Sequence, residues 1–264
     1  SAENKTDTVK QFYNNVNRDT KYSKINNKEN HPAYNDLEYC INKYNLRNHK
    51  TLEIGSGKGA LQDITNDYHG IDIAESLEKY YKKKFTVIQE NKPYPFKDNC
   101  FDFIFSYATF EHVPDINQSL SETVRVLNKK GYLFFRPAWN CRSWAAEGYQ
   151  VRPYSDFNLA GKLIKFSIPF RDNFFVRALY MFPLRLLILT CFLINKRMLR
   201  DKLFYFKLKP NYEIFWQSDS DAVNSLDPFI CSLYFIANGF KILNYPNILK
   251  SLFIKSDYLL MQKL

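Results

Sequence analysis

The chain has 264 residues, 45% of them hydrophobic and 17% aromatic, and a formal net charge of +10. This apolar content is enough to form a buried core, which excludes disorder as a description of the whole chain. The five cysteines stand far apart without metal or redox spacing, which excludes a disulfide scaffold and predicts a reduced, cytoplasmic protein.

The positive charge is concentrated in one segment. Residues 162–209 contain eleven Lys or Arg against two acids, a balance of +9, so the rest of the chain is nearly neutral. We therefore expect the charge to concern a partner or substrate of that segment, and not the fold.

Residues 1–49 are polar, with aromatic side chains at intervals, and are predicted to form an N-terminal helical cap. The segment has no apolar stretch, so no signal peptide is expected.

Residues 50–136 alternate short apolar runs with helical patterns and are predicted to form the core of an α/β fold. The runs are bounded by Gly, Asp, Asn or Pro, as expected of strands buried in a parallel sheet. The predicted strands are Thr51–Ile54, His69–Ile73, Phe85–Gln89, Phe101–Tyr107 and Gly131–Phe135. Strand and helix in alternation predict a doubly wound sheet of right-handed βαβ units.

The remaining chain divides in two. Residues 137–216 break the alternation and are predicted to form a basic, aromatic, helical insert. Residues 217–264 resume it and are expected to complete the core sheet, with a helix over 219–237 and strands over 239–243 and 253–262. These strands predict a terminal antiparallel hairpin.

The first strand runs into the glycine-rich turn Gly55-Ser-Gly57-Lys-Gly59, which is expected to open a helix. Glycines let the backbone approach a ligand, and a helix N-terminus offers unpaired N–H groups, so a nucleotide-type ligand is predicted. Two cofactors fit. The spacing of Gly55, Gly57 and Ala60 matches the fingerprint of dinucleotide-binding sites. An acid, Glu53, before three alternate glycines suits a site for S-adenosylmethionine (SAM).

The second strand ends at Asp72, whose carboxylate could accept both ribose hydroxyls of either cofactor. The distance from Gly59 to Asp72 leaves room for a helix of only about two turns.

A third group of motifs distinguishes between the two possible cofactors. Tyr94-Pro-Phe96 is followed by Phe101-Asp102, by Glu111-His112-Val-Pro, and then by a predicted helix over 118–127. With the glycine turn in this order, residues 50–136 resemble the class I SAM-dependent methyltransferases of the broad group called type 11. The alternative, an NAD-binding Rossmann oxidoreductase, is not expected to carry this run.

The resemblance implies a Rossmann-like, seven-stranded methyltransferase sheet with SAM as its cofactor. The family's glycines line the methionine portion of SAM, its first acid lies near the amino group, and later acids hold the ribose and read the adenine. The cofactor residues that the resemblance implies here are Glu53, Gly55, Gly57, Gly59, Asp72, Ile73, Glu90, Asn91, Ser106 and Tyr107.

The transfer of a methyl group to oxygen needs a base, and histidine is the usual one near neutral pH. Of four histidines, His112 alone lies in the motif block, so it is the predicted catalytic base, with Glu111 as a second candidate. No zinc-type ligand spacing is present, so no metal is expected. Ser106-Tyr-Ala-Thr109 replaces the Pro-Pro-aromatic signature of base-methylating enzymes, which argues against a nucleic-acid acceptor.

In this family the acceptor pocket is built from the N-terminal segment and from the chain after the fifth strand. Aromatic rings with one or two arginines suit a sugar, nucleotide or phosphorylated acceptor, although the tryptophans could equally just pack the insert. The candidate acceptor residues are Tyr13, His31, Tyr34, Arg136, Trp139, Asn140, Trp144, Tyr149, Arg152 and Trp216.

The apolar stretch from Ala178 to Asn195 is interrupted by Arg185, which argues against a membrane-spanning helix. A helix from Pro183 would place Arg185, Lys196 and Arg200 on one arc. Such a helix suits a cap on the core or on a dimer mate, a membrane surface, or contact with nucleic acid.

We therefore expect a cytoplasmic SAM-dependent O-methyltransferase. Its acceptor would be small and sugar- or phosphate-bearing, or linked to a nucleotide or glycan, as in surface-polysaccharide biosynthesis or secondary metabolism. The alternative is a membrane-associated enzyme that acts on a lipid-linked acceptor.

Overall fold

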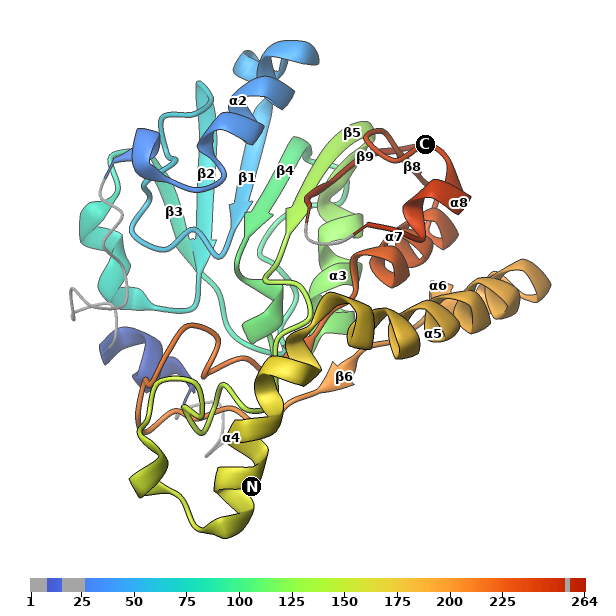
Figure 1. The fold of residues 1–264 in the computed structure, drawn as a ribbon. Helices are drawn as coiled ribbons and strands as arrows, with labels where there is room; N and C mark the ends of the chain where they lie inside the picture. The colour runs from blue at the N-terminus through green and yellow to red at the C-terminus, as the bar shows by residue number, and fades with distance from the viewer. Residues whose placement is uncertain (1–8, 16–26, 255–256) are drawn as a thin grey trace.

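A mixed seven-stranded sheet forms the centre of the computed structural model, which describes residues 9–15, 27–254 and 257–264 (Figure 1). The strand order is β3-β2-β1-β4-β5-β9-β8. Neighbours among β1 to β5 run parallel, whereas β9 is antiparallel to both β5 and β8. The predicted doubly wound sheet with a terminal antiparallel hairpin is confirmed. Its strands are β1 (Lys50–Ile54), β2 (Asp67–Asp72), β3 (Lys84–Val87), β4 (Phe101–Tyr107), β5 (Leu127–Arg136), β8 (Phe240–Ile242) and β9 (Leu259–Lys263).

Helices cover both faces of this sheet because its central strands are buried on both sides. The helix α2 packs on one face, with Leu37 and Ile41 against Phe103 and Phe105 of β4. The helices α3 and α7 pack on the other face, around Ile104. The helices of the core are α2 (Tyr34–Lys43), α3 (Ile116–Val126), α7 (Pro228–Ala237) and α8 (Ile248–Ser251), with short 3-10 turns η1 (Lys28–Asn30), η2 (Leu46–Asn48), η3 (Glu75–Tyr80) and η4 (Phe110–His112).

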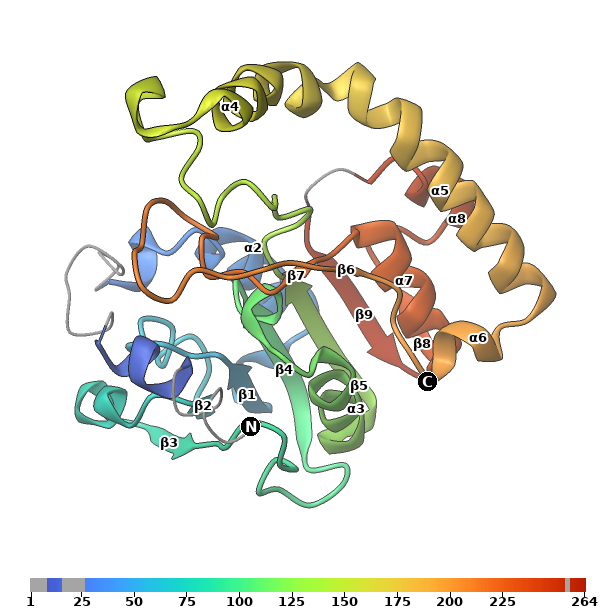
Figure 2. The same ribbon diagram turned by 90° about the horizontal axis from the view of Figure 1, so that it is seen from below.

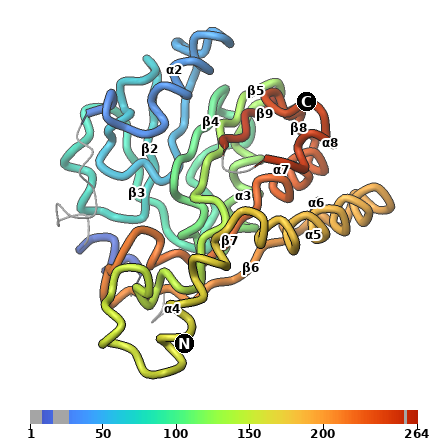
Figure 3. The backbone as a smooth tube through the Cα atoms, viewed as in Figure 1, coloured from blue at the N-terminus to red at the C-terminus, as the bar shows by residue number. Residues whose placement is uncertain are grey.

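The insert after β5 leaves the core as a chain of helices, which curves around the periphery of the molecule in Figure 2. It returns along β6, which pairs with β7 in a separate two-stranded sheet. The backbone trace in Figure 3 shows the same path. The elements of the insert are η5 (Tyr154–Asp156), α4 (Leu159–Asp172), α5 (Phe174–Ile194), α6 (Arg197–Arg200) and β6 (Phe206–Lys207), and β7 (Asn224–Ser225) follows the insert.

The prediction of a helix between Gly59 and Asp72 is wrong. This stretch forms consecutive turns, from which Leu61 and Ile64 enter the core. The side chain of Gln62 accepts hydrogen bonds from the backbone N–H groups of Lys82 and Lys83, so it joins the turns to the next connection.

The C-terminal elements also differ from the prediction. The expected helix over 219–237 begins only at Pro228, because Asp227 accepts from the N–H groups of Phe229 and Ile230 and so caps α7 there. The strand expected over 253–262 begins only at Leu259. Earlier in the expected range, the carbonyl of Ile254 accepts from the guanidinium of Arg185.

The helix expected to begin at Pro183 begins instead at Phe174. Asn173 caps it by accepting from the N–H groups of Phe175 and Val176. Because α5 ends at Ile194, Lys196 and Arg200 do not share an arc of it with Arg185.

The division of the chain into four units remains a prediction. The units are 1–49, 50–136, 137–216 and 217–264. The helices α4 to α6 fall within the third, and β8 and β9 fall within the fourth.

Candidate functional site

A cavity of about 290 Å³ opens at the carboxyl ends of the parallel strands. This edge of a doubly wound sheet is where such folds bind their ligands. The walls come from the glycine turn, the tip of β2, the segment after β3, the turn η4 and the start of α3. The lining residues used below are Tyr13, His31, Gly55, Gly57, Asp72, Ile73, Glu90, Asn91, Tyr107, Thr109 and His112.

The glycine turn is held close to the tip of β2. Gly55 and Ser56 donate their N–H groups to the carbonyl of Ile71, and the N–H of Gly57 donates to Asp72 Oδ2 over 3.1 Å. Gly55 has φ +70 and Gly57 φ +51, a region that favours glycine. A Cβ at Gly57 would meet nothing within 4 Å, so the turn leaves a space in the cavity that a side chain would fill.

Asp72 lies at the centre of this wall. Its Oδ1 accepts from the N–H of Ala74 over 3.1 Å, which fixes the carboxylate with both oxygens oriented by the backbone. Burial raises the pKa of Asp72, although hydrogen bonds from Ala74 and Gly57 oppose this. Each oxygen retains a further lone pair, so the carboxylate can still accept from ligand hydroxyls.

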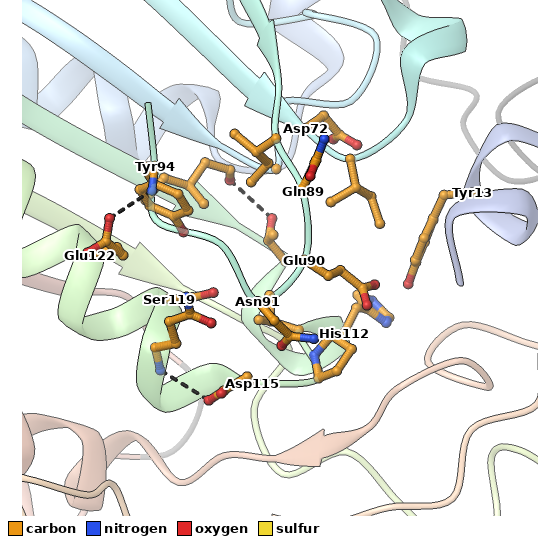
Figure 4. Close-up of a pocket in the computed structure, with 18 of the residues that line it drawn as sticks. Tyr13, Asp72, Gln89, Glu90, Asn91, Tyr94, His112, Asp115, Ser119 and Glu122 are labelled. Atoms are coloured by element: carbon orange, nitrogen blue, oxygen red, sulfur yellow. Dashed lines mark hydrogen bonds between the residues drawn. The ribbon is translucent and has the colours of Figure 1, made fainter. Parts of the chain in front are cut away.

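Glu90 lines the next part of the cavity, and Figure 4 shows it between Asp72 and His112. Its Oε1 is buried without a hydrogen-bond partner, and burial raises the pKa of the carboxyl to about 7. A buried acceptor of this kind needs a donor, which a bound ligand would supply.

Three residues implied for SAM binding lie outside the lining. Glu53 is buried behind the turn, accepts from the hydroxyl of Tyr68, and has a pKa that burial raises to about 8. Ser106 donates from Oγ to the carbonyl of Ile54 over 3.0 Å. A Cβ at Gly59 would lie 2.9 Å from the ring of Tyr81, so this glycine permits close packing.

His112 lines the cavity and faces three carboxylates. Its Nδ1 lies 3.3 Å from Asp221 Oδ2, and its Nε2 lies 3.6 Å from Glu111 Oε1. The same Oδ2 accepts from the hydroxyl of Tyr13 over 2.8 Å. Glu111 is fully buried, and it lies beside His112 without lining the cavity.

The chain after the insert brings Asp221 to this site. The N–H of Val223 donates to the carbonyl of Glu111 over 2.8 Å. The amide of Asn224 donates to the carbonyls of Phe110 and Val113, over 3.0 and 2.7 Å. The segment around β7 is thus fastened to η4, the turn that carries His112.

The pKa of His112 reflects two opposed effects. Burial lowers it, but Glu111, Asp221 and Asp219 together outweigh burial and raise the pKa above its usual value. Burial raises the pKa of Glu111 and of Asp219. The ligand atoms of Glu111, His112 and Asp219 also lie within 4.8 Å of one another, close enough for a cation, although the sequence predicts no metal.

A second histidine, His31, lines the cavity beside Tyr107, with their rings edge to face and 4.9 Å apart. Its Nδ1 accepts from the N–H of Ala33. Burial, with a further effect of Arg136, lowers the pKa of His31 to about 4. His31 is therefore neutral at physiological pH and a weaker base than His112.

The other predicted acceptor residues lie outside the lining of the cavity, and different contacts hold several of them. Arg136 pairs with Asp36 at 2.6 Å, and Trp139 Nε1 donates to the carbonyl of Asp257 over 2.7 Å. The guanidinium of Arg152 lies over Trp216, 4.7 Å from the ring centre. The residues placed outside the lining are Tyr34, Arg136, Trp139, Asn140, Trp144, Tyr149, Arg152 and Trp216, so Tyr13 and His31 alone of the candidates line it.

Sequence reasoning missed several lining residues. Thr109 donates from Oγ1 to the carbonyls of Ile54 and Tyr107 and packs against Gly55. Its place after the fourth strand could have identified it. Asp115 and Ser119, at the start of α3, follow the Glu-His motif directly. No local sequence motif identifies Asp221, because the sequence around it has the pattern of a helix.

Comparison with known proteins agrees with this geometry. Residues 52–135 match the family described as "Methyltransferase domain". The chain is 28% identical over 137 residues to the malonyl-[acyl-carrier protein] O-methyltransferase 1 of Coxiella burnetii, covering 46% of this chain and 48% of that protein. It is 28% identical over 93 residues to phosphoethanolamine N-methyltransferase 2 of Caenorhabditis elegans, covering 30% and 21%.

A solved SAM-dependent methyltransferase from Aquifex aeolicus aligns at 24% identity and a TM-score of 0.35, over 43% of this chain and 71% of that one. The chain spans less than half the length of the curated relatives it matches. The family match coincides with the strands and turns that build the cavity. Residues 52–135 thus form a methyltransferase domain of the class I, SAM-dependent kind, and this match indicates SAM as its cofactor.

Proposed function

We propose that the protein is a SAM-dependent O-methyltransferase in which His112 is the general base. The observation that carries this proposal is one cavity in which Gly57, Asp72 and Glu90 lie on one side and the carboxylate-paired His112 on the other.

The residues of the cavity fit the cofactor. The open space beside Gly57 would receive its methionine portion, Asp72 would accept from its ribose hydroxyls, and Glu90 would accept from its adenine amino group. When bound, SAM supplies an electrophilic methyl group on a positively charged sulfur.

The chain's own residues would position and deprotonate the acceptor. Neutral His112 would take the proton of an acceptor hydroxyl, so that the hydroxyl oxygen becomes nucleophilic toward the methyl group that bound SAM would supply. The imidazolium that forms is stabilised by Asp221 and Glu111. Tyr13, which donates to Asp221, keeps that carboxylate directed at the imidazole. Placement of the two reactants in one cavity supplies much of the rate.

The acceptor is proposed to be small and sugar- or phosphate-bearing, as in surface-polysaccharide biosynthesis, in a cytoplasmic setting. The +9 charge of residues 162–209 supports an anionic group on the acceptor, although none of these residues lines the cavity. A lipid-linked acceptor is the second candidate, favoured by the apolar surface that α4 and α5 leave exposed.

The test has two stages. Calorimetry should detect SAM binding, and incubation with pools of hydroxylated acceptors should yield S-adenosylhomocysteine. His112→Ala should abolish turnover while SAM binding is kept, because His112 lies on the acceptor side. SAM binding without turnover in any pool would contradict the catalytic part. Binding of NAD in place of SAM would contradict the whole proposal.

A further inference from the structure

The helices α4 and α5, together called the arm, expose a large apolar surface. On α5, Phe175 is 76% exposed, Leu179 77% and Leu187 61%. The arm's exposed large apolar residues are Leu159, Leu163, Ile164, Phe166, Phe170, Phe174, Phe175, Val176, Leu179, Tyr180, Phe182, Leu186, Leu187, Leu193 and Ile194. An apolar surface of this extent is uncommon on a protein that works alone in water.

Among the described residues, α5 is the one helix long and apolar enough to cross a membrane. Only 22% of an apolar 18-residue stretch of this helix is buried, whereas a core helix of a soluble protein is mostly buried. Length and composition alone therefore leave two arrangements: a helix that spans a bilayer, or a helix that lies on one.

The contacts of Arg185 favour a helix that lies on the surface. In the middle of α5, its Nη2 donates to Asp227 Oδ2 over 2.8 Å and to the carbonyl of Ile254 over 2.8 Å. Ile188, Leu189 and Phe192 are buried on the same side of the helix. This face of the second half of α5 is fastened to the methyltransferase core, so the helix cannot pass through a bilayer as it stands.

The charges around the arm indicate what covers its other face. The cations that are exposed on the arm and just after it are Lys162, Arg171, Lys196, Arg197, Arg200 and Lys202. Of the two acids in this stretch, Asp172 is paired with Arg142 at 3.1 Å, whereas Asp201 is exposed between Arg200 and Lys202. Apolar side chains flanked by Lys and Arg are the pattern of helices that lie in the interface of an anionic membrane. A second copy would bring like charges together.

We propose that the arm docks the protein on an anionic membrane surface, with its exposed apolar side chains in the lipid interface and its flanking cations on the headgroups. Figure 1 shows α4 beyond the end of the sheet where the cavity opens. Docking would thus hold the cavity near the membrane, where a lipid-linked acceptor could reach it. The docking itself does not depend on the proposed reaction.

Co-sedimentation of the full chain with vesicles tests this docking. Vesicles that contain phosphatidylglycerol should pellet the protein, and vesicles of phosphatidylcholine alone should pellet much less of it. Added salt should weaken the binding, because the cations contribute to it. No binding to anionic vesicles would overturn the proposal.

Two variants separate the apolar and ionic contributions. The triple variant Phe175→Ser, Leu179→Ser and Leu187→Ser should reduce the bound fraction at least about tenfold. The charge variant Lys196→Glu, Arg197→Glu and Arg200→Glu should abolish the preference for anionic lipid. A matched charge control elsewhere on the surface, Lys97→Glu with Lys129→Glu and Lys241→Glu, should bind as the wild type does.

The readouts distinguish docking from loss of fold and from self-association. Each variant should keep its melting temperature and its affinity for SAM, since the substituted side chains are exposed. Light scattering should show the same mass for wild type and the apolar variant. A wild-type dimer that the apolar variant dissociates, without vesicle binding, would assign the surface to a second copy and overturn the proposal.

Discussion

His112 Nδ1 lies 3.3 Å from Asp221 Oδ2, which joins the turn after β4 to the segment that follows the insert. The same carboxylate oxygen accepts from the hydroxyl of Tyr13. Three distant parts of the chain thus converge on the proposed base, and Asp221 acts with Glu111 and Asp219 to raise its pKa. This relationship makes the pH dependence of turnover the most direct measure of the site.

The first prediction concerns Asp221→Asn. The neutral imidazole is the base, so activity should fall as pH drops through the pKa of His112, which neighbouring carboxylates raise. Removal of one carboxylate lowers that pKa, and the acidic limb of kcat should move to lower pH by about one unit.

The control for Asp221→Asn is Asp63→Asn, which removes an exposed acid and should leave the profile in place. The same assay with a chelator tests whether a cation at Glu111, His112 and Asp219 contributes. An acidic limb that stays fixed in Asp221→Asn would contradict the assignment of His112.

The second prediction concerns Glu90, whose pKa burial raises to about 7. Below that pH the carboxyl is protonated, and above it the carboxylate accepts more strongly and attracts the cationic cofactor. SAM affinity should therefore rise between about pH 6 and pH 8. Glu90→Gln should flatten this rise, whereas Glu78→Gln at an exposed site should keep it. Calorimetry across the pH range makes the measurement, and an unchanged slope in Glu90→Gln would refute it.

The third prediction compares three glycines with positive φ. A Cβ at Gly55 would lie 2.2 Å from Thr109 Oγ1, so Gly55→Ala should lower the free energy of unfolding by about 2–3 kcal/mol. At Gly57 and Gly239 a Cβ would meet nothing within 4 Å, so each Ala variant should cost about 1 kcal/mol from backbone strain. Of these last two, only Gly57→Ala should also weaken SAM binding, because its methyl group enters the cavity. Equal affinities in the Gly57 and Gly239 variants would show that the turn does not hold the cofactor.

The glycine turn and Asp72 could be placed from the sequence because their positions depend on neighbouring strands. Two parallel strands that pair in register bring their carboxyl ends together, whatever lies elsewhere in the chain. The strand at Phe101–Tyr107 was predicted with its observed bounds for a similar reason, since a continuous apolar run has few alternatives inside a sheet.

Asp221 could not be found in this way, because its approach to His112 depends on how the insert returns to the core. The predicted helix over 219–237 concealed it, since Asp227 and Pro228 start the helix later than the apolar pattern does. Arg152 and Trp216 show the opposite error. They are chemically suited to a ligand, but they stack on each other outside the cavity.

The last prediction concerns the buried pair of Arg185 and Asp227, each with a side chain only 8% exposed. Arg185→Met leaves the carboxylate of Asp227 buried without its cation, so it should lower the free energy of unfolding by about 3–5 kcal/mol. The double variant Arg185→Met with Asp227→Asn should recover part of this loss, because the asparagine oxygen can still cap α7. The exposed pair of Lys84 and Asp67, 3.5 Å apart, serves as the control, and Lys84→Met should cost less than about 1 kcal/mol. Chemical denaturation measures all four proteins. If Arg185→Met is as stable as Lys84→Met, the ion pair does not hold α5 to the core. The contacts of Arg185 would then no longer favour a helix that lies on a membrane over one that crosses it.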